Sequence, residues 1–116
     1  MKRVLHVIPG YGGGISSHIR NLIIGINKER ITIDVVGFTD YPNEFIENIE
    51  NKNGKAYRIK NVRVKSLFSN IREFNTIIRN GNYDAIHLHV SDFQALYFSS
   101  LARINKVKRI IVHAHI

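Results

Sequence analysis

Apolar residues along the chain follow two patterns, short unbroken runs and repeats at helical spacing. The runs predict buried strands, because a strand covered on both faces is apolar throughout. The repeats recur every three or four residues, as on one face of a helix. The expected strands are 4–8, 31–38, 56–59, 84–89 and 108–113. Three of the expected helices are 15–26, 66–81 and 92–104. A further short helix lies between the second and third strands, where Thr39 or Asp40 caps its start and Asn53-Gly54 ends it.

Strands and helices alternate from one end of the 116 residues to the other. Such alternation predicts an α/β fold in which helices cover both faces of a parallel sheet. Right-handed crossovers and the usual doubling-back give a Rossmann-like, doubly wound sheet with strand order 3-2-1-4-5. We expect ligands at the carboxyl ends of the strands, where the order reverses between strands 1 and 4. The length fits one domain, 1–116.

Four glycines in six residues, 9–14, connect the first strand to the first helix. Glycines let a ligand approach the backbone, and the N–H groups and dipole of a helix start favour an anion such as a phosphate. The glycines fit neither G-x-G-x-x-G nor a P-loop, which disfavours a dinucleotide-dependent oxidoreductase. A tight turn with no ligand is the alternative.

Histidines follow the fourth and fifth strands. His87 and His89 share one face of the fourth strand, followed by Asp92, and His113 and His115 end the fifth. We expect His89, Asp92, His113 and His115 to meet the glycine loop in one crevice and bind substrate there. A metal centre built from the four histidines, with a carboxylate from Asp92, is a second interpretation.

Two further histidines precede these. His6 lies within the first strand, and we expect it in the core. His18 lies in the first turn of the first helix and faces either ligand or solvent.

The formal charge is +8, and basic residues cluster in 55–79 and 103–109. Such a surface suits phosphates, anionic lipid or nucleic acid, or is simply solvated. No helix-turn-helix, zinc-finger or aromatic stacking pattern is present, so we expect no nucleic-acid partner. The absence of cysteine excludes thiolate chemistry and fits the cytoplasm. No apolar run reaches the ~18 residues of a membrane helix.

Three segments together resemble a known family: MKRVLHVIPGYGGGISSHIRNL, NGNYDAIHLHVSDF and VKRIIVHAHI. They are similar to the N-terminal domain of retaining glycosyltransferases of the GT-B fold, in the glycosyl transferases group 1 family. Bacterial members that build capsular and other surface polysaccharides are the most similar. The family's glycine loop matches Gly12, Gly13 and Gly14, its D-[VI]-[VIL]-H-x-H strand matches 84–89, and its strand-closing histidine matches His113. Ala85 and the register of 9–11 depart from the pattern.

The resemblance implies that 1–116 is the acceptor-side half of an enzyme whose C-terminal nucleotide-sugar domain lies outside this chain. The intact enzyme would transfer a sugar from a nucleotide-sugar to a polysaccharide or lipid-linked acceptor, with retention. It implies that Gly12, Gly13 and Gly14 approach the donor diphosphate and that His113 contacts the donor sugar as the catalytic residue. It implies no metal and no cofactor besides the nucleotide-sugar substrate.

We expect this fragment to be inactive alone, because half a cleft cannot hold donor and acceptor together. We expect a cytoplasmic enzyme with peripheral contact to the inner face of the membrane through 55–79. Two other functions stay open at this point. One is a metal-dependent hydrolase that uses the strand-end histidines, and the other is a non-catalytic α/β binding module.

Overall fold

The computed structural model describes residues 2–60, 64–90 and 92–113. It contains a five-stranded, all-parallel sheet in the order β3-β2-β1-β4-β5. In chain order the elements are β1 (Lys2–Val7), α1 (Gly13–Gly25), β2 (Ile31–Gly37), α2 (Asn43–Asn51), β3 (Ala56–Arg58), η1 (Val64–Ser66), α3 (Leu67–Gly81), β4 (Ala85–Leu88), α4 (Asp92–Ile104) and β5 (Arg109–Val112). The predicted Rossmann-like α/β fold and its strand order are confirmed.

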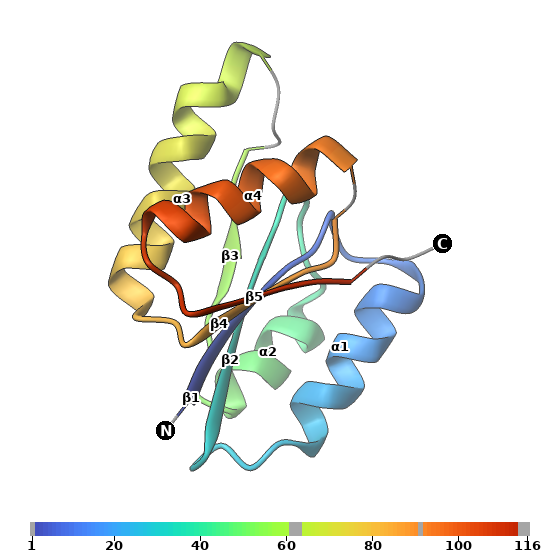
Figure 1. Cartoon of the computed structure of the whole chain (residues 1–116). Helices are drawn as coiled ribbons and strands as arrows, with labels where there is room; N and C mark the ends of the chain where they lie inside the picture. The colour runs from blue at the N-terminus through green and yellow to red at the C-terminus, as the bar shows by residue number, and fades with distance from the viewer. Residues whose placement is uncertain (1, 61–63, 91, 114–116) are drawn as a thin grey trace.

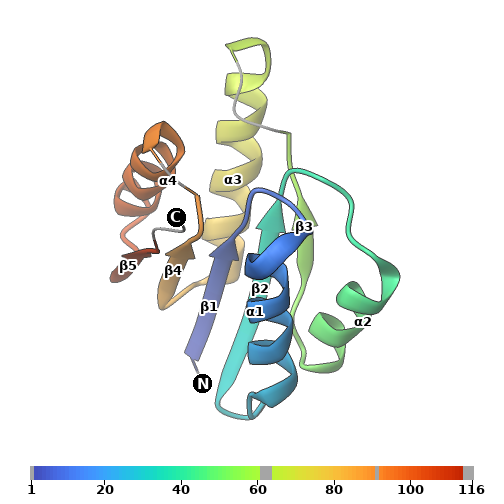
Figure 2. The ribbon, with the colours of Figure 1, turned by 90° about the vertical axis from the view of Figure 1, so that its right-hand side faces the viewer.

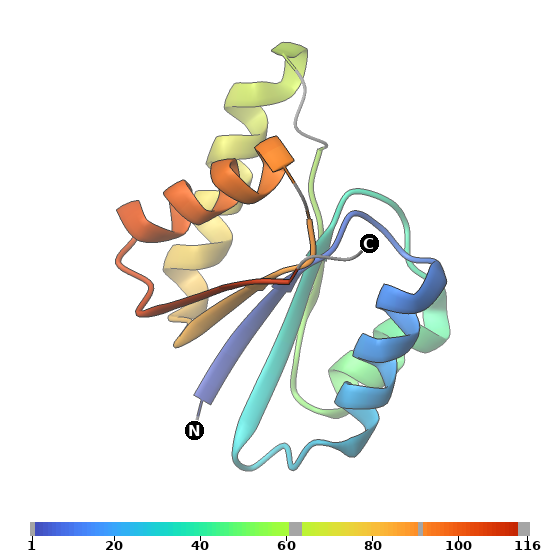
Figure 3. The same ribbon diagram turned by 45° about the vertical axis from the view of Figure 1, so that its right-hand side comes forward.

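The sheet separates two apolar layers. Helices α1 and α2 cover one face, and α3 and α4 cover the other (Figures 1 and 3). Alternate residues of β1 therefore serve different layers. Leu5 and Val7 pack with Phe74 of α3 and Phe98 of α4, whereas Ile8, just after β1, packs in the α1–α2 layer.

The predicted side-chain cap of α2 is wrong. Pro42 occupies the N-cap position, and no side chain bonds the first turn. Both proposed capping side chains are engaged elsewhere. Asp40 pairs with Arg58 of β3 at 2.6 Å, and Thr39 Oγ1 accepts a hydrogen bond from the Tyr11 N–H at 3.3 Å. Partners distant in sequence have displaced the local cap. At the other end of α2, Asn53 adopts a positive φ of 66°, as expected of a helix stop.

The α1 side of β5 stays open in the described part of the chain. Helices α1 and α2 lie over β1, β2 and β3 (Figure 2). Ile111 of β5 is paired in register with His87 of β4, so both side chains lie on this side. Ile111 is 46% exposed. In the described part of the chain, the α1-facing side of β4 can therefore be reached from the β5 side.

Candidate functional site

Histidines from four elements meet at the carboxyl edge of the sheet. His6 of β1 is paired in register with His87 of β4, so their side chains lie on the same, α1, face. His89 follows two residues later on that face. The ring centroids lie 4.9 Å apart for His6–His87, 5.2 Å for His6–His89 and 4.2 Å for His87–His89. The sheet register therefore packs the three imidazoles together.

The inner pair of this group is buried. His6 and His89 are each 3% exposed, and His6 Nδ1 lies 2.9 Å from His89 Nε2. One ring donates and the other accepts, so at least one nitrogen of the pair carries a lone pair. Burial, followed by the nearby imidazoles of His87 and His18, lowers the pKa of His6 from 6.5 to about 3. His6 is therefore neutral near pH 7.

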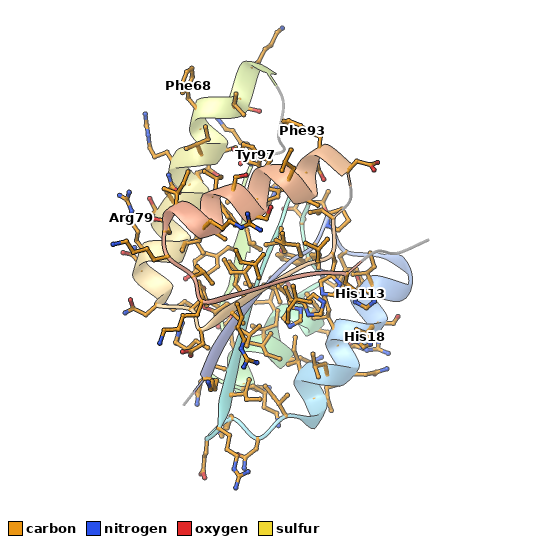
Figure 4. All side chains as sticks on the ribbon, viewed as in Figure 1. His18, Phe68, Arg79, Phe93, Tyr97 and His113 are labelled. Atoms are coloured by element: carbon orange, nitrogen blue, oxygen red, sulfur yellow. The ribbon has the colours of Figure 1, made fainter. Side chains whose placement is uncertain are left out.

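The outer part of the site is exposed. His113 follows β5, and its backbone N–H donates to the Leu88 carbonyl at 2.9 Å. Its ring centroid lies 5.4 Å from that of His87 and 5.5 Å from that of His89. The ring of His18 in α1 meets that of His113 edge-on, with 6.4 Å between the ring centroids; both residues are labelled in Figure 4. His18 is therefore exposed, beside the ring of His113.

The glycine loop lies where α1 begins. Gly12 and Gly13 have φ values of 141° and 69°, conformations that residues other than glycine rarely adopt. The Gly12 N–H donates to Ser16 Oγ at 2.7 Å, and no side chain caps the helix. A Cβ placed on Gly14 would meet nothing within 4 Å. Neither backbone conformation nor packing requires glycine at 14, so the open space there is available to a ligand.

The donor group contains no acidic residue among those described. Asp92 begins α4, exposed, with a φ of 54°. Among the described residues, the donor atoms that lie within 4.8 Å of one another belong to His6, His87 and His89, without a carboxylate. His115 lies outside the described residues. The close donor group in the described part of the chain thus contains His6, which is buried as expected, together with His87 and His89 of the histidines expected for a metal-dependent hydrolase.

The sequence gives only a weak sign that His6 belongs to the histidine cluster. Its ring interrupts the apolar run of β1, but that alone is equally typical of a histidine in the core. Its pairing with β4 depends on the strand register, which is a tertiary property.

A surface cavity of about 380 Å³ lies at the opposite edge of the sheet, where Asp84 and Lys108 precede β4 and β5. Parallel sheets bind ligands at the carboxyl ends of their strands. The imidazoles and the glycine loop of this chain gather at that carboxyl edge, opposite the cavity. An imidazole there can hydrogen-bond a hydroxyl group or, through a lone pair, bind a metal ion.

No protein-family model matches the chain, and no curated protein sequence matches it. Among solved structures, the chain is similar to the crystal structure of a glycosyltransferase from Rickettsia africae ESF-5, with a TM-score of 0.65 and 15% sequence identity. The likeness covers 96% of this chain and 29% of that one. At this identity the comparison supports a glycosyltransferase-like fold, and the chain spans less than a third of the length of its structural neighbour.

Proposed function

We propose that this chain is the N-terminal, acceptor-side part of a retaining GT-B glycosyltransferase. The intact enzyme would move a sugar from a nucleotide-sugar to a polysaccharide or lipid-linked acceptor, as in the assembly of bacterial capsular and other surface polysaccharides. The observation that carries the proposal is the meeting of His18 and His113, at 6.4 Å between ring centroids. This contact brings the start of α1, where a phosphate would bind favourably, next to the end of β5. Both belong to a glycosyltransferase-like fold.

The donor diphosphate would approach Gly12, Gly13 and Gly14. Support comes from the positive φ values of Gly12 and Gly13 and from the open space beside Gly14. The start of a helix without a side-chain cap offers N–H groups and the positive end of the helix dipole. A diphosphate at this position would receive both hydrogen bonds and favourable electrostatics.

His113 is proposed to contact the donor sugar, with His89, Asp92 and His115 lining the substrate site. The exposed His113 ring lies on the accessible side of the cluster, beside the ring of His89. An imidazole there can hydrogen-bond a sugar hydroxyl and orient the ring as positive charge develops on it. On this proposal transfer needs neither metal nor cofactor, and the fragment alone is inactive because the other half of the cleft is required.

A stripe on α3 supports peripheral contact with the cytoplasmic face of a membrane. Phe68 and Arg72 are exposed and four residues apart, so they lie on one side of α3, and the exposed Lys65 lies in η1, which directly precedes the helix. Phe68 is 83% exposed, and its ring extends away from the helix (Figure 4). An aromatic side chain flanked by cations suits an anionic lipid surface. Of the other basic residues in 55–79, Arg58 is paired with Asp40, and Arg63 lies outside the described residues.

None of the helices in the described part of the chain combines the length and apolar character that a bilayer crossing requires.

The proposed function is tested by titrating the ¹⁵N-labelled chain with nucleoside diphosphates and nucleotide-sugars. The expected result is a saturable shift of the amide signals of Gly12, Gly13, Gly14 and His113. An intact enzyme containing this chain should then release nucleoside diphosphate from one nucleotide-sugar and form a product with retained anomeric configuration. Binding without turnover in the intact protein would favour a non-catalytic binding module, and absence of these shifts in the intact protein, where both halves of the cleft are present, would contradict the donor site.

A further inference from the structure

We propose that His6, His87 and His89 form a binding site for a divalent transition-metal ion such as Zn²⁺. Each residue offers an imidazole nitrogen, and the three donor atoms lie within 4.8 Å of one another. Three histidines with an open fourth position are a known zinc ligand set, used in carbonic anhydrase. The site is additional to sugar transfer, for which the proposed function needs no metal.

The strands hold the three side chains in place. His87 lies in β4 and His89 directly after it, two residues on, and the register sets His6 of the neighbouring strand opposite His87. The carboxyl end of β4 is itself fixed, because the His89 N–H donates to the Val7 carbonyl at 2.8 Å. A site on two hydrogen-bonded strands is more rigid than a site on loops.

The three imidazole nitrogens can reach one metal ion by side-chain adjustment alone. Two nitrogens bound to one tetrahedral Zn²⁺ lie about 3.3 Å apart, given bonds of about 2.0–2.1 Å. His6 Nδ1 and His89 Nε2 already approach to 2.9 Å around a shared proton. The stacked ring of His87, 4.2 Å from that of His89, needs to rotate to direct its nitrogen at the same point. The ring that donates in the His6–His89 pair moves its proton to its other nitrogen, so both lone pairs become available.

The ligand chemistry selects the class of ion. The donor group contains imidazoles and no carboxylate, which suits Zn²⁺, Co²⁺ or Ni²⁺ and not the oxygen-seeking Mg²⁺ or Ca²⁺. His6 and His89 are buried, but His87 is only half-buried, and on the β5 side its ring lies beside the exposed ring of His113 in the described part of the chain. The ion can enter there, and its fourth position faces that side.

The test is calorimetric titration of the chain with Zn²⁺ and, separately, Mg²⁺ at pH 7.5. We expect one Zn²⁺ per chain and no Mg²⁺ uptake. His89→Gln should weaken Zn²⁺ binding by on the order of 100-fold or more, because loss of groups that merely orient ligands already costs about 10- to 100-fold. His18→Ala, which removes an exposed imidazole outside the donor group, should bind Zn²⁺ as the unmodified chain does.

A second measurement needs no substitution. In long-range ¹H–¹⁵N spectra of the unmodified chain, one equivalent of Zn²⁺ should shift the ring nitrogens of His6, His87 and His89. Co²⁺ should give the intense visible absorption of a four-coordinate ion. Absence of Zn²⁺ binding, or shifts confined to the exposed rings of His18 and His113, would overturn the proposal.

Discussion

The carboxylate of Asp34, fully buried in β2, lies 3.0 Å from the guanidinium of Arg3 in β1. The same carboxylate accepts hydrogen bonds from the Tyr83 hydroxyl and the Lys55 N–H, so it joins β1, β2 and the segments before β3 and β4. Burial and this hydrogen bond to Asp34 raise the pKa of Tyr83 well above its ordinary value. The group lies away from the histidine edge, and its contacts are structural.

Removing this carboxylate should destabilise the fold. Asp34→Ala leaves the buried Tyr83 hydroxyl without its acceptor and the Arg3 cation without its partner, so we expect a loss of about 3–5 kcal/mol. Asp40→Ala is the matched control, because its 2.6 Å pair with Arg58 is exposed and such pairs contribute about 0–1 kcal/mol. Urea denaturation measures both variants. Equal losses would contradict the structural role of Asp34.

Asp34 and His6 show where prediction from sequence reaches its limit. The strand order was predictable because the alternation of elements can be read along the chain and the handedness of crossovers is common to parallel sheets. A polar residue inside a doubly covered strand carries no local sign of its partner on the neighbouring strand. Asp34 meets Arg3, and His6 meets His89, only because the register aligns strands far apart in sequence. The meeting of strand ends and glycine loop was predictable, whereas these pairs were not.

The open space beside Gly14 predicts that a side chain added there will weaken nucleoside diphosphate binding without lowering the stability of the fold. Gly14→Ala and Gly25→Ala lie at opposite ends of α1, and at both positions an added Cβ meets nothing within 4 Å. Both variants should be at least as stable as the unmodified chain, since alanine favours helix by up to about 1 kcal/mol. Gly14→Ala alone should weaken nucleoside diphosphate binding roughly tenfold, about 1.4 kcal/mol. Equal affinities of the two variants in an NMR titration would remove Gly14 from the donor site.

The buried imidazole of His6 predicts a loss of stability in mild acid. Its pKa falls from 6.5 to about 3 on folding, because of burial and the imidazoles of His87 and His18. The unfolded chain therefore binds more protons between these values, so stability decreases as the pH falls from about 6.5 towards 3. Between pH 7 and pH 5 this group should cost about 2 kcal/mol.

Denaturation with a chelator present, at pH 7 and pH 5, checks this expectation while keeping metal ions out. His6→Gln keeps a polar side chain but cannot titrate, so its stability should change less over the same interval. If the unmodified chain and His6→Gln lose the same stability, groups other than His6 control the acid response.

The stripe on α3 predicts binding to anionic vesicles. Arg72→Gln should weaken binding about fivefold, the effect of about 1 kcal/mol per basic residue near the surface, and added salt should weaken it further. Phe68→Ser should also weaken binding by removing the exposed aromatic side chain. Ile24→Ser removes an exposed apolar side chain from α1, on the other face of the sheet, and should leave binding unchanged. Vesicle binding that is independent of lipid charge and salt would exclude this role.

The last prediction separates a role of His113 in transfer from a role in folding. Its ring is exposed, and its backbone N–H donates to the Leu88 carbonyl. His113→Ala keeps that hydrogen bond, so the melting temperature should change little. In an intact enzyme that contains this chain, kcat should fall by about 10²-fold or more, as when one positioned polar group is lost from a transition state.

His115→Ala is the comparison, because this residue would lie on the same face if the strand continued beyond Val112. Transfer kinetics and thermal melting should be measured on both variants. A near-normal kcat for His113→Ala with a large loss for His115→Ala would assign the sugar contact to His115. A lowered melting temperature with normal kcat would make His113 a structural residue. If His113→Ala alone loses turnover at unchanged stability, the ring at the end of β5 orients the donor sugar, because its removal then affects the transition state and not the fold.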